Sequence, residues 1–404
     1  MRILVLHRLP ANEIRYAQAI DHAIHQVTYV GVKDRLANLP DDLPCTRLER
    51  PGTDDVAHEV LAAVAGMPHP DLVVALAESD LIPAARVREH LGVEGAREDA
   101  VLPVRDKVVM KAAVAAAGLS TPRFLALEEI LTSSTRKIPW QGPTVLKPRG
   151  SAMSQHVQVF PTPSATLDRV ASQGIPGGGQ STDFEIEEFI DAPVVHVDGL
   201  VVDDEVVVSQ AYRYEGTCLE FAEGRPQADI QIETTPELSR WASDCLKAVG
   251  LRTSIFHLEG FQTPQGMVFL EIGARHAGGG TMDTFELATG VHLPSSYLRL
   301  LMSGGTERPE PRTPDPENLY ADFIYPCVPH SEGRVTIQEE ARFRENPLVR
   351  RWQQRAPETA VAHRLSYAVA DAPLGGVIGP AASTDLSRYV RELFDTVVVR
   401  YETA

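Results

Sequence analysis

Hydrophobic residues in the first part of the chain form short continuous runs, and amphipathic stretches separate them. Residues 2–7, 26–32 and 71–76 are apolar runs of the length and composition of buried strands. Residues 12–24 and 56–65 instead carry the helical pattern. Buried strands that alternate with helices predict a parallel sheet covered on both faces, which is an α/β arrangement.

The loop after the run 71–76 carries Glu78, Ser79 and Asp80. Ligands of open α/β sheets lie beyond the carboxyl ends of the strands, so Glu78 is a candidate for substrate contact. The alternative is that Ser79 or Asp80 caps the helix that follows. No G-x-G-x-x-G follows the first strand, which excludes the usual dinucleotide fingerprint.

Two lysines precede and enter a glycine- and serine-rich segment. A helix is expected from residue 107 to 117, with Asp106 at its start and Gly118 at its end. Forty residues after the first lysine, a second one ends the apolar strand 143–148, and a strand returns at 156–160. The loop between these strands can wrap phosphate oxygens with its N–H groups and hydroxyls, although it is not a Walker A motif. The candidate residues are Lys107, Lys147, Gly150, Ser151 and Ser154.

Two acidic side chains interrupt a predicted β-hairpin. Residues 257–261 and 267–272 are apolar and flank the turn sequence Thr-Pro-Gln-Gly, and Glu259 and Glu271 lie within them. A carboxylate in a buried strand costs several kcal/mol without compensation, so a divalent metal ion is a natural partner. The alternative is that both glutamates form ordinary cross-strand ion pairs.

A glycine-rich turn at 276–280 follows the hairpin and enters a helix predicted for 281–290. Free N–H groups at Gly278 and Gly279 are candidates for binding an anionic substrate group, and the alternative is a tight turn that needs positive φ. His276 is a candidate for substrate contact, or a structural histidine. His196 and His257 lie in strand patterns and are expected to be packed and hydrogen-bonded.

Composition limits the classes of partner. The chain has 404 residues, which suits two or three packed units, and its net charge is −17. This charge argues against a nucleic-acid or anionic-membrane partner, so any bound phosphate must be held by locally placed cations. The four cysteines are far apart and suggest neither a disulfide framework nor a zinc site. No long apolar run and no signal sequence is seen, so a soluble, cytoplasmic protein is expected.

Further motifs support a resemblance to a known superfamily. Residues 183–190 read as a strand with alternating acidic and apolar positions, and 194–202 as a returning strand. The two lysines, the small-residue loop, this acidic strand and the paired glutamates occur in the order and approximate spacing of the ATP-grasp superfamily. Within it the chain resembles the carboxylate–amine ligases that join amino acids, the L-amino-acid (dipeptide) ligases. The resemblance covers roughly residues 1–300.

The resemblance implies an organisation in three parts. Residues 1–104 would be an α/β pre-ATP-grasp domain, and 105–305 the ATP-grasp core with a mobile lid at about 122–183. Residues 306–404 would be an α+β region that completes the substrate site. This last part begins with a proline- and acid-rich stretch at 306–317 and has no motif of its own. Strands are predicted at 319–328, 334–337, 360–369, 376–378 and 396–401, and a helix at 383–393.

The resemblance also implies roles for individual residues. Lys107 and Lys147 would hold ATP phosphates under the loop from Gly150 to Ser154, and Glu259 and Glu271 would bind Mg²⁺, with Mn²⁺ as an alternative. Arg275 would face the transferred phosphoryl group, with Lys147 as its partner in catalysis. A guanidinium group and hard oxygen ligands suit these tasks. The residues bordering the adenine would be Glu187, Glu188, Phe189 and Ile190.

Two positions depart from the pattern of these relatives. Gly273 stands where many relatives have an asparagine whose side chain binds a second metal ion. Val194 stands where relatives often have a ribose-binding acid, and Asp198 lies too far along the strand to replace it. Metal and ribose binding at these two positions are therefore open.

The predicted activity is formation of an amide or peptide bond between an amino-acid carboxylate and an amine, through an acyl phosphate, with release of ADP and phosphate. One alternative is an ATP-grasp carboxylase or purine-type ligase that uses bicarbonate or formate. A third is a nucleotide-binding protein without catalysis. Small-molecule substrates and a homodimer are expected. The sequence does not identify the two substrates.

Overall fold

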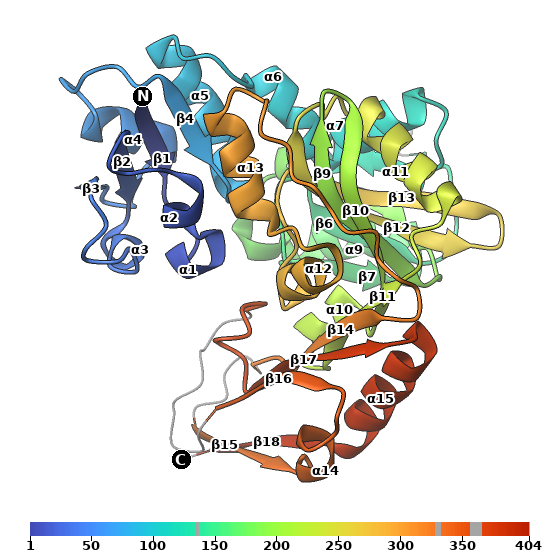
Figure 1. Cartoon of the computed structure of the whole chain (residues 1–404). Helices are drawn as coiled ribbons and strands as arrows, with labels where there is room; N and C mark the ends of the chain where they lie inside the picture. Colours follow the sequence, from blue (N-terminus) through green and yellow to red (C-terminus); the bar gives the residue numbers. More distant parts are fainter. Residues whose placement is uncertain (134–136, 328–332, 356–365, 404) are drawn as a thin grey trace.

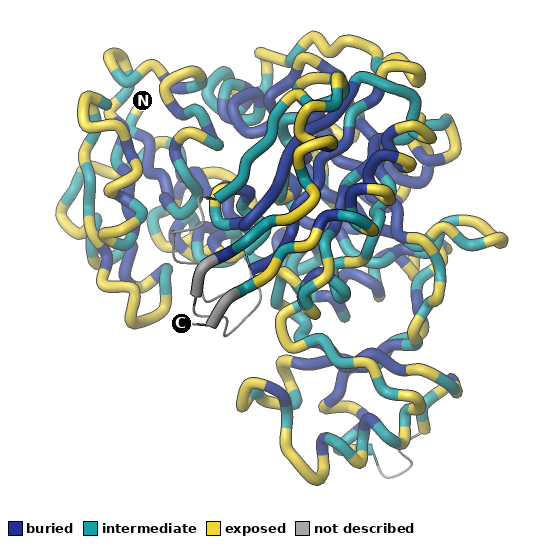
Figure 2. The backbone as a smooth tube through the Cα atoms, turned by 90° about the horizontal axis from the view of Figure 1, so that it is seen from below, coloured by how far each residue is buried: buried dark blue, intermediate teal, exposed yellow. Residues whose placement is uncertain are grey.

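The structure is a computed structural model that describes residues 1–133, 137–327, 333–355 and 366–403. An amino-terminal sheet with its helices packs beside a large central sheet, and the carboxy-terminal elements extend below it (Figure 1). Buried backbone is concentrated in the interior strands of these sheets (Figure 2).

The amino-terminal sheet is parallel, with strand order β3-β2-β1-β4, which confirms the predicted α/β unit. Its third strand in sequence, β3, was not predicted, because Thr-Arg-Leu-Glu contains no apolar run and is only partly buried. The elements are β1 (Arg2–Leu6), β2 (Gln26–Gly31), α3 (Lys33–Leu36), β3 (Thr46–Glu49), α4 (Val56–Ala63), β4 (Leu72–Ala75), α5 (Leu81–Leu91) and α6 (Glu98–Val101).

The helix predicted for 12–24 is wrong. Two helices of four residues, α1 (Ala11–Ile14) and α2 (Tyr16–Ala19), flank Arg15 in the left-handed conformation, with φ 58°. Arg15 donates two hydrogen bonds to the carboxylate of Glu286, 2.7 and 2.8 Å long. The break in the helix therefore coincides with an ion pair to a distant segment, which local sequence patterns do not reveal.

A second, four-stranded sheet has the order β5-β8-β6-β7 and forms the part of the chain expected to be a lid. The lysine strand and its return are antiparallel neighbours, and the acidic strand pairs with the other edge of the lysine strand. The elements are β5 (Phe124–Ala126), α8 (Leu127–Thr132), β6 (Thr144–Pro148), β7 (Gln158–Phe160), α9 (Pro163–Gln173) and β8 (Phe184–Glu188).

The central sheet has eight strands in the order β13-β12-β9-β10-β11-β14-β17-β16. It crosses the boundary expected at residue 306, because three strands from beyond that point extend it. Its strands are β9 (Val194–Val202), β10 (Glu205–Glu215), β11 (Gln227–Ile232), β12 (Ser254–Thr263), β13 (Gly266–Gly273), β14 (Leu319–Ile324), β16 (Val349–Gln354) and β17 (Leu374–Ala381).

Helices cover both faces of the central sheet. Trp241 and Cys245 of α11 and Met110 of α7 pack with Val197 and Phe256 on one face. On the other face, a second cluster joins strands β9, β10 and β12 to α12 and α13. The helices are α7 (Lys107–Ala116), α10 (Cys218–Ala222), α11 (Pro236–Ala248), α12 (Thr281–Thr289) and α13 (Leu293–Met302).

The carboxy-terminal elements pack α15 (Ser383–Thr396) against β11, β14 and β17, around Phe323 and Leu386. The strands β15 (Gly333–Gln338) and β18 (Val398–Thr403) pair with each other, and α14 (Ala341–Arg344) precedes β16. The strand predicted for 360–369 falls mainly on residues outside the described part of the chain. In the described part, no helix has the length and apolar character needed to cross a membrane.

Candidate functional site

The two hairpin glutamates lie directly opposite each other. Strands β12 and β13 pair antiparallel with Glu259 in register with Glu271, as the sequence predicts. Like charges placed opposite each other in this way destabilise a sheet. Glu271 lies 3.2 Å from the Lys107 ammonium, whereas Glu259 accepts hydrogen bonds from Tyr214 (2.6 Å) and His257 (3.1 Å) through the same oxygen, Oε1. Neither glutamate therefore forms the simple cross-strand ion pair considered as the alternative.

Helix α7 places Lys107 between the paired glutamates and the phosphate loop. The helix begins there because the Asp106 side chain accepts hydrogen bonds from the N–H groups of Val108 and Val109. The Lys107 ammonium donates to the Ser151 carbonyl over 2.7 Å. The first lysine thus joins the Gly/Ser loop to Glu271.

Lys147 belongs to a buried group of four charges that the sequence analysis found only in part. Its ammonium lies 2.6 Å from Glu187 and 3.9 Å from Glu185. Lys111, one turn after Lys107 on α7, contacts both of these carboxylates and is completely buried. We call Lys111, Lys147, Glu185 and Glu187 the buried tetrad. Lys111 was missed because an isolated lysine in a helix is normally solvated.

The charges of the site shift the pKa values of its carboxyl groups. Burial alone would raise the pKa of Glu271, but Lys107, Lys147 and Arg275 lower it to about 2. Burial raises the pKa of Glu185, against the effect of Lys111 and Lys147. Burial also acts to raise the pKa of Glu187, yet the same two lysines lower it below its ordinary value. Glu271 is therefore ionised and able to bind a cation at neutral pH.

Glu78 of the amino-terminal unit and Arg275 meet at the edge of this site. Arg275 Nε donates to Glu78 over 2.6 Å, and Arg105 contacts the other oxygen of the same carboxylate. Arg105 also donates to the Gly150 carbonyl over 2.7 Å. Asp80 is the N-cap residue of α5 but makes no capping hydrogen bond through its side chain, and it instead accepts two hydrogen bonds from Arg8. Arg105 was not identified from the sequence, although its position just before Asp106 and Lys107 was a usable signal.

Gly273 makes room for Arg275. A Cβ atom at Gly273 would lie 3.2 Å from Cγ and 3.4 Å from Nε of Arg275, closer than most real contacts. Glycine at this position therefore leaves space for the Arg275 side chain. An asparagine here would require the Arg275 side chain to shift by a few tenths of an ångström.

The segment expected to border the adenine connects β8 to β9. The Glu188 carboxylate binds Arg123, and the Phe189 N–H donates to the Pro143 carbonyl over 3.0 Å. Asp198 is fully buried between His196 and His257. It is therefore not available to bind a ribose, in agreement with the sequence analysis.

His196, Asp198 and His257 form a buried hydrogen-bonded group. The Asp198 carboxylate accepts hydrogen bonds from Nδ1 of His196, over 2.6 Å, and from Nδ1 of His257, over 2.9 Å. Their ligand atoms lie close enough to bind a metal ion, but these atoms already pair with one another. Burial lowers the pKa of His196, and Asp198 and Asp229 more than offset this and raise it to about 10. Both histidines are packed and hydrogen-bonded, as expected from the sequence.

Two N–H groups of the glycine turn, those of Gly279 and Gly280, already have hydrogen-bond partners. The Gly279 N–H donates to the Tyr367 carbonyl over 3.0 Å, and the Gly280 N–H donates to Asp322 over 2.7 Å. Gly279 has a φ of +65°, which fits the alternative of a tight turn. His276 is buried, and desolvation and Arg275 lower its pKa to about 3, so it is neutral at physiological pH.

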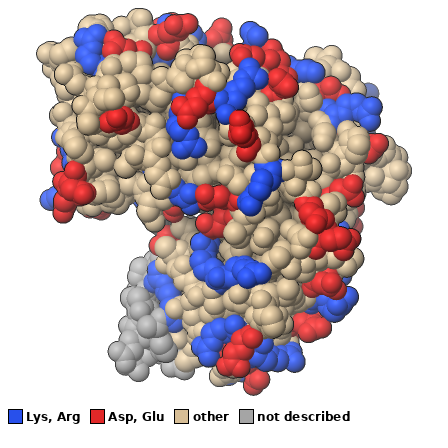
Figure 3. Space-filling model, viewed as in Figure 1, with Lys and Arg blue, Asp and Glu red and all other residues tan. Residues whose placement is uncertain are grey.

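The described residues fit a nucleotide and a divalent metal ion. Lys107, Lys147 and Arg275 provide the positive charge that phosphates need, and the opposed carboxylates of Glu259 and Glu271 are the hard oxygen ligands that Mg²⁺ prefers. On the face drawn in Figure 3, basic and acidic side chains are interspersed rather than gathered by sign.

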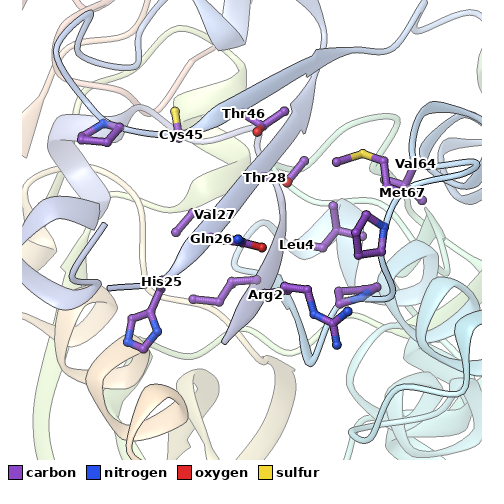
Figure 4. Close-up of a pocket in the computed structure, with 14 residues that line it drawn as sticks. Arg2, Leu4, His25, Gln26, Val27, Thr28, Cys45, Thr46, Val64 and Met67 are labelled. Atoms are coloured by element: carbon purple, nitrogen blue, oxygen red, sulfur yellow. The ribbon is translucent and has the colours of Figure 1, made fainter. Parts of the chain in front are cut away.

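A pocket of about 380 Å³ lies elsewhere, beside the amino-terminal sheet (Figure 4). Arg2, Gln26 and Thr46, which line it, are the first residues of β1, β2 and β3. The pocket is therefore at the amino ends of the parallel strands, whereas Glu78 follows the carboxyl end of β4. Parallel α/β sheets bind their ligands at the carboxyl ends, so this pocket does not coincide with the candidate site at Glu78.

The chain is similar to known proteins in part of its sequence and in its fold. No family model matches the chain. An ATP-grasp enzyme, fsqD, of Aspergillus fumigatus is 23% identical over 257 residues, which are 56% of this chain and 41% of that protein. The chain thus spans less than half the length of this relative.

Solved structures match over the whole chain. The L-amino acid ligase of Bacillus licheniformis is 19% identical, with a TM-score of 0.70 over 100% of this chain and 98% of its own. Phosphoribosylglycinamide synthetase of Anaerococcus prevotii is 12% identical, with a TM-score of 0.63 over 99% of each chain. The biotin carboxylase domain of 2-oxoglutarate carboxylase of Hydrogenobacter thermophilus is 12% identical, with a TM-score of 0.62 over 99% of this chain and 90% of its own.

Proposed function

We propose that this chain, which has the ATP-grasp fold, is an ATP-dependent ligase that joins an amino-acid carboxylate to an amine. The observation that carries the proposal is that Lys107 contacts Glu271 opposite Glu259, while Lys147 and Arg275 lie near enough to help lower the pKa of Glu271. Phosphoryl transfer needs charge neutralisation and positioning rather than a covalent group from the protein, and these residues supply both.

The charge balance of the site supports a metal–nucleotide complex as its ligand. The site contains five basic and five acidic side chains, and all of them except Glu259 form ion pairs within this set. ATP with two Mg²⁺ ions carries no net charge and leaves this balance unchanged, whereas free ATP adds about four negative charges. Binding of ATP should therefore depend strongly on the metal ion. The basic residues are Lys107, Lys111, Lys147, Arg105 and Arg275, and the acidic ones are Glu78, Glu185, Glu187, Glu259 and Glu271.

The proposed reaction has two steps. A carboxylate oxygen of the substrate attacks the γ-phosphorus of ATP, the bond to the β-phosphate oxygen breaks, and ADP leaves. The amine then attacks the carbonyl carbon of the acyl phosphate, loses a proton, and displaces inorganic phosphate. Lys147 and Arg275 stabilise the charge that develops on the phosphoryl oxygens. The lid at about 122–183 has to exclude water, because the acyl phosphate would otherwise hydrolyse.

The test is ADP release with Mg·ATP against pairs of amino acids, with product masses read from the same reactions. A product equal in mass to both substrates minus water supports the ligase. Lys147→Ala and Glu271→Ala should each abolish nearly all turnover while the protein stays folded. Lys247→Ala, an exposed lysine on α11, serves as the matched control. Normal turnover in either site variant would overturn the assignment.

A second candidate keeps the ATP site and changes the substrate. The fold also matches carboxylase domains, one of them in complex with MgADP and bicarbonate. Turnover that depends on bicarbonate or formate and not on amino acids would favour this candidate. Binding of Mg·ATP without any substrate-dependent ADP release would instead favour a protein that only binds nucleotide. Gel filtration would test the proposed homodimer.

A further inference from the structure

A row of polar side chains crosses one face of the central sheet. It starts at the paired glutamates, where His196 of β9 is in register with Glu259 of β12. It continues through Tyr212 and Tyr214 of β10 and ends at an acidic pair. The glycine turn and α12 lie against this face, beside β10 and β14 (Figure 1).

The acidic pair is formed by Asp229 and Asp322, which lie directly opposite each other on β11 and β14. One oxygen of each carboxylate supports the start of α12: Asp322 Oδ2 accepts the Gly280 N–H, and Asp229 Oδ2 accepts the Thr281 hydroxyl over 2.8 Å. The other oxygen of each, Oδ1, is buried and has no hydrogen-bond partner among the described residues. Asp322 is 1% exposed, so this is a costly arrangement without a ligand.

A third unsatisfied atom points at the same place. His196 Nε2 is fully buried, has no hydrogen-bond partner among the described residues, and lies 3.5 Å from Asp229 Oδ1. With its pKa raised to about 10 by Asp198 and Asp229, His196 carries a proton on this nitrogen and is not a metal ligand. His196 therefore directs an N–H toward Asp229 Oδ1, whereas no donor of the described residues faces Asp322 Oδ1, and a protonated histidine makes this place unsuitable for a metal ion.

The acidic pair adjoins the proposed reaction site. Tyr214 bridges the two regions, because its hydroxyl donates to Glu259 while its backbone is in register with Asp229. Both Glu259 and Asp229 act electrostatically on Tyr367, which packs beside Gly278. The Asp229 side chain is 14% exposed, although its Oδ1 atom is buried.

We propose that Asp229 and Asp322 form a subsite for the protonated amino group of an amino-acid substrate. This inference rests on the proposed ligase function and adds that a cationic nitrogen is recognised by carboxylates beside the metal-binding strands. An ammonium group has three N–H donors, which can satisfy the free Oδ1 atoms of both aspartates. Hydrogen bonds between charged partners are roughly twice as strong as neutral ones, so the amino group would contribute much of the affinity.

The chemistry of the turn agrees with a cationic ligand. The carboxylates occupy the Gly280 N–H and the Thr281 hydroxyl, which an anionic group would otherwise need. A Cβ atom at Gly280 would lie 2.6 Å from the Asp322 Cβ, so glycine is required for the turn to approach the acidic pair this closely. Arg351 acts on Asp322 electrostatically, but it pairs with Asp283 at 2.6 Å.

The test is direct binding, measured by calorimetry in the presence of MgADP without turnover. Each common amino acid is compared with its 2-hydroxy acid, such as alanine with lactate, because the pair differs only in the ammonium group. At least one amino acid should bind, and its 2-hydroxy counterpart should bind more weakly. Asp229→Asn and Asp322→Asn should each weaken the amino acid roughly 10- to 100-fold, the value of a hydrogen bond to a charged group, and leave MgADP affinity unchanged.

Asp283→Asn is the matched control. This variant also removes one negative charge, but from α12, where the Asp283 side chain is 40% exposed and pairs with Arg351. The inference is overturned if no amino acid binds, if the 2-hydroxy acids bind as tightly, or if both aspartate variants keep the wild-type affinity. Asparagine can still accept the hydrogen bonds that start α12, so the fold should be retained, and circular dichroism checks this.

A separate assay tests the proposed function. Hydroxylamine traps an acyl phosphate as a hydroxamate, so ATP-dependent hydroxamate formation reports carboxylate activation without the natural amine. If an amino acid binds in a way that depends on Asp229 and Asp322, but no hydroxamate forms, the ligase function is refuted and the subsite is supported. Hydroxamate formation from amino acids and 2-hydroxy acids alike would support carboxylate activation and refute the subsite.

Discussion

Replacing Lys111 by methionine tests whether the buried tetrad is a structural charge network or a nucleotide contact. In the wild type, Lys111 lies 2.8 Å from Glu185 and also contacts Glu187, and all three side chains are nearly or fully buried. Methionine fills a similar volume without charge. After the substitution Glu187 keeps Lys147 at 2.6 Å, whereas Glu185 retains only the more distant contact of 3.9 Å with Lys147. Glu185 is therefore the carboxylate that loses its close positive partner.

The loss of stability is set by whichever costs less free energy: leaving Glu185 ionised without a close partner, or keeping it protonated. An unpaired buried carboxylate costs about 3–5 kcal/mol. Keeping Glu185 protonated instead costs about 1.4 kcal/mol for each pH unit above the ordinary glutamate pKa of about 4.3, or about 4 kcal/mol at pH 7 and 1 kcal/mol at pH 5. A carboxyl group whose folded pKa is raised loses stability as the pH rises above its unfolded pKa. Lys111→Met should therefore be strongly destabilising at pH 7 and nearly neutral at pH 5.

Thermal unfolding at both pH values checks this. For 404 residues that unfold together, 4 kcal/mol corresponds to a decrease of about 5 °C in Tm. Trp140 is buried in the hydrophobic cluster beside β6 and β8, so its fluorescence reports unfolding of the sheet that carries Lys147 and Glu185. Lys111→Met combined with Glu185→Gln should recover most of the loss at pH 7, and Lys247→Met is the control for an exposed lysine. Equal destabilisation at both pH values, or no recovery in the double variant, would refute the reasoning.

Three further predictions address the site. Asp322→Asn should raise Tm at pH 7 to 8. Burial and Asp229 raise the pKa of Asp322, so the wild type loses stability as the pH rises above the ordinary pKa of an aspartate. A lower Tm than that of Asp283→Asn would contradict this. Arg105→Ala should raise KM for Mg·ATP about tenfold, since it removes charged hydrogen bonds to Glu78 and the Gly150 carbonyl, and initial rates at varied ATP concentration measure this. Gly273→Asn should lower kcat rather than improve metal use, because the new side chain displaces Arg275; an increase in turnover would show that the metal ligand matters more.

The sequence predicted most of the elements that carry the site, because these elements have strong local signals. Buried strands, the Asp106-capped helix and the β12–β13 hairpin are set by apolar runs, caps and turn residues. The resemblance to the ATP-grasp fold, which rested on the order of these motifs, is confirmed by the structural matches. The roles of individual site residues remain predictions.

What the sequence did not reveal depends on contacts between distant segments. The break at Arg15 coincides with its ion pair to Glu286, 271 residues away, and Arg105 gains its importance from Glu78 and Gly150. The glycine turn was expected to bind an anion because its N–H groups were expected to be free. Its partner Asp322 comes from β14, beyond the expected domain boundary, so the opposite charge preference emerges only in the folded chain.

Two pairs of carboxylates are placed directly opposite each other on one sheet, Glu259 with Glu271 and Asp229 with Asp322. Opposed like charges cost stability, so each pair needs a positive partner. Glu271 has Lys107, and a divalent metal ion would complete the first pair. The second pair has only a protonated histidine 3.5 Å from one of its members, while an oxygen of each aspartate remains unpaired within the described structure. The raised pKa of Asp322, caused by burial and Asp229, is typical of a carboxyl group that lacks a cation, and a substrate ammonium group is the cation that the proposed reaction supplies.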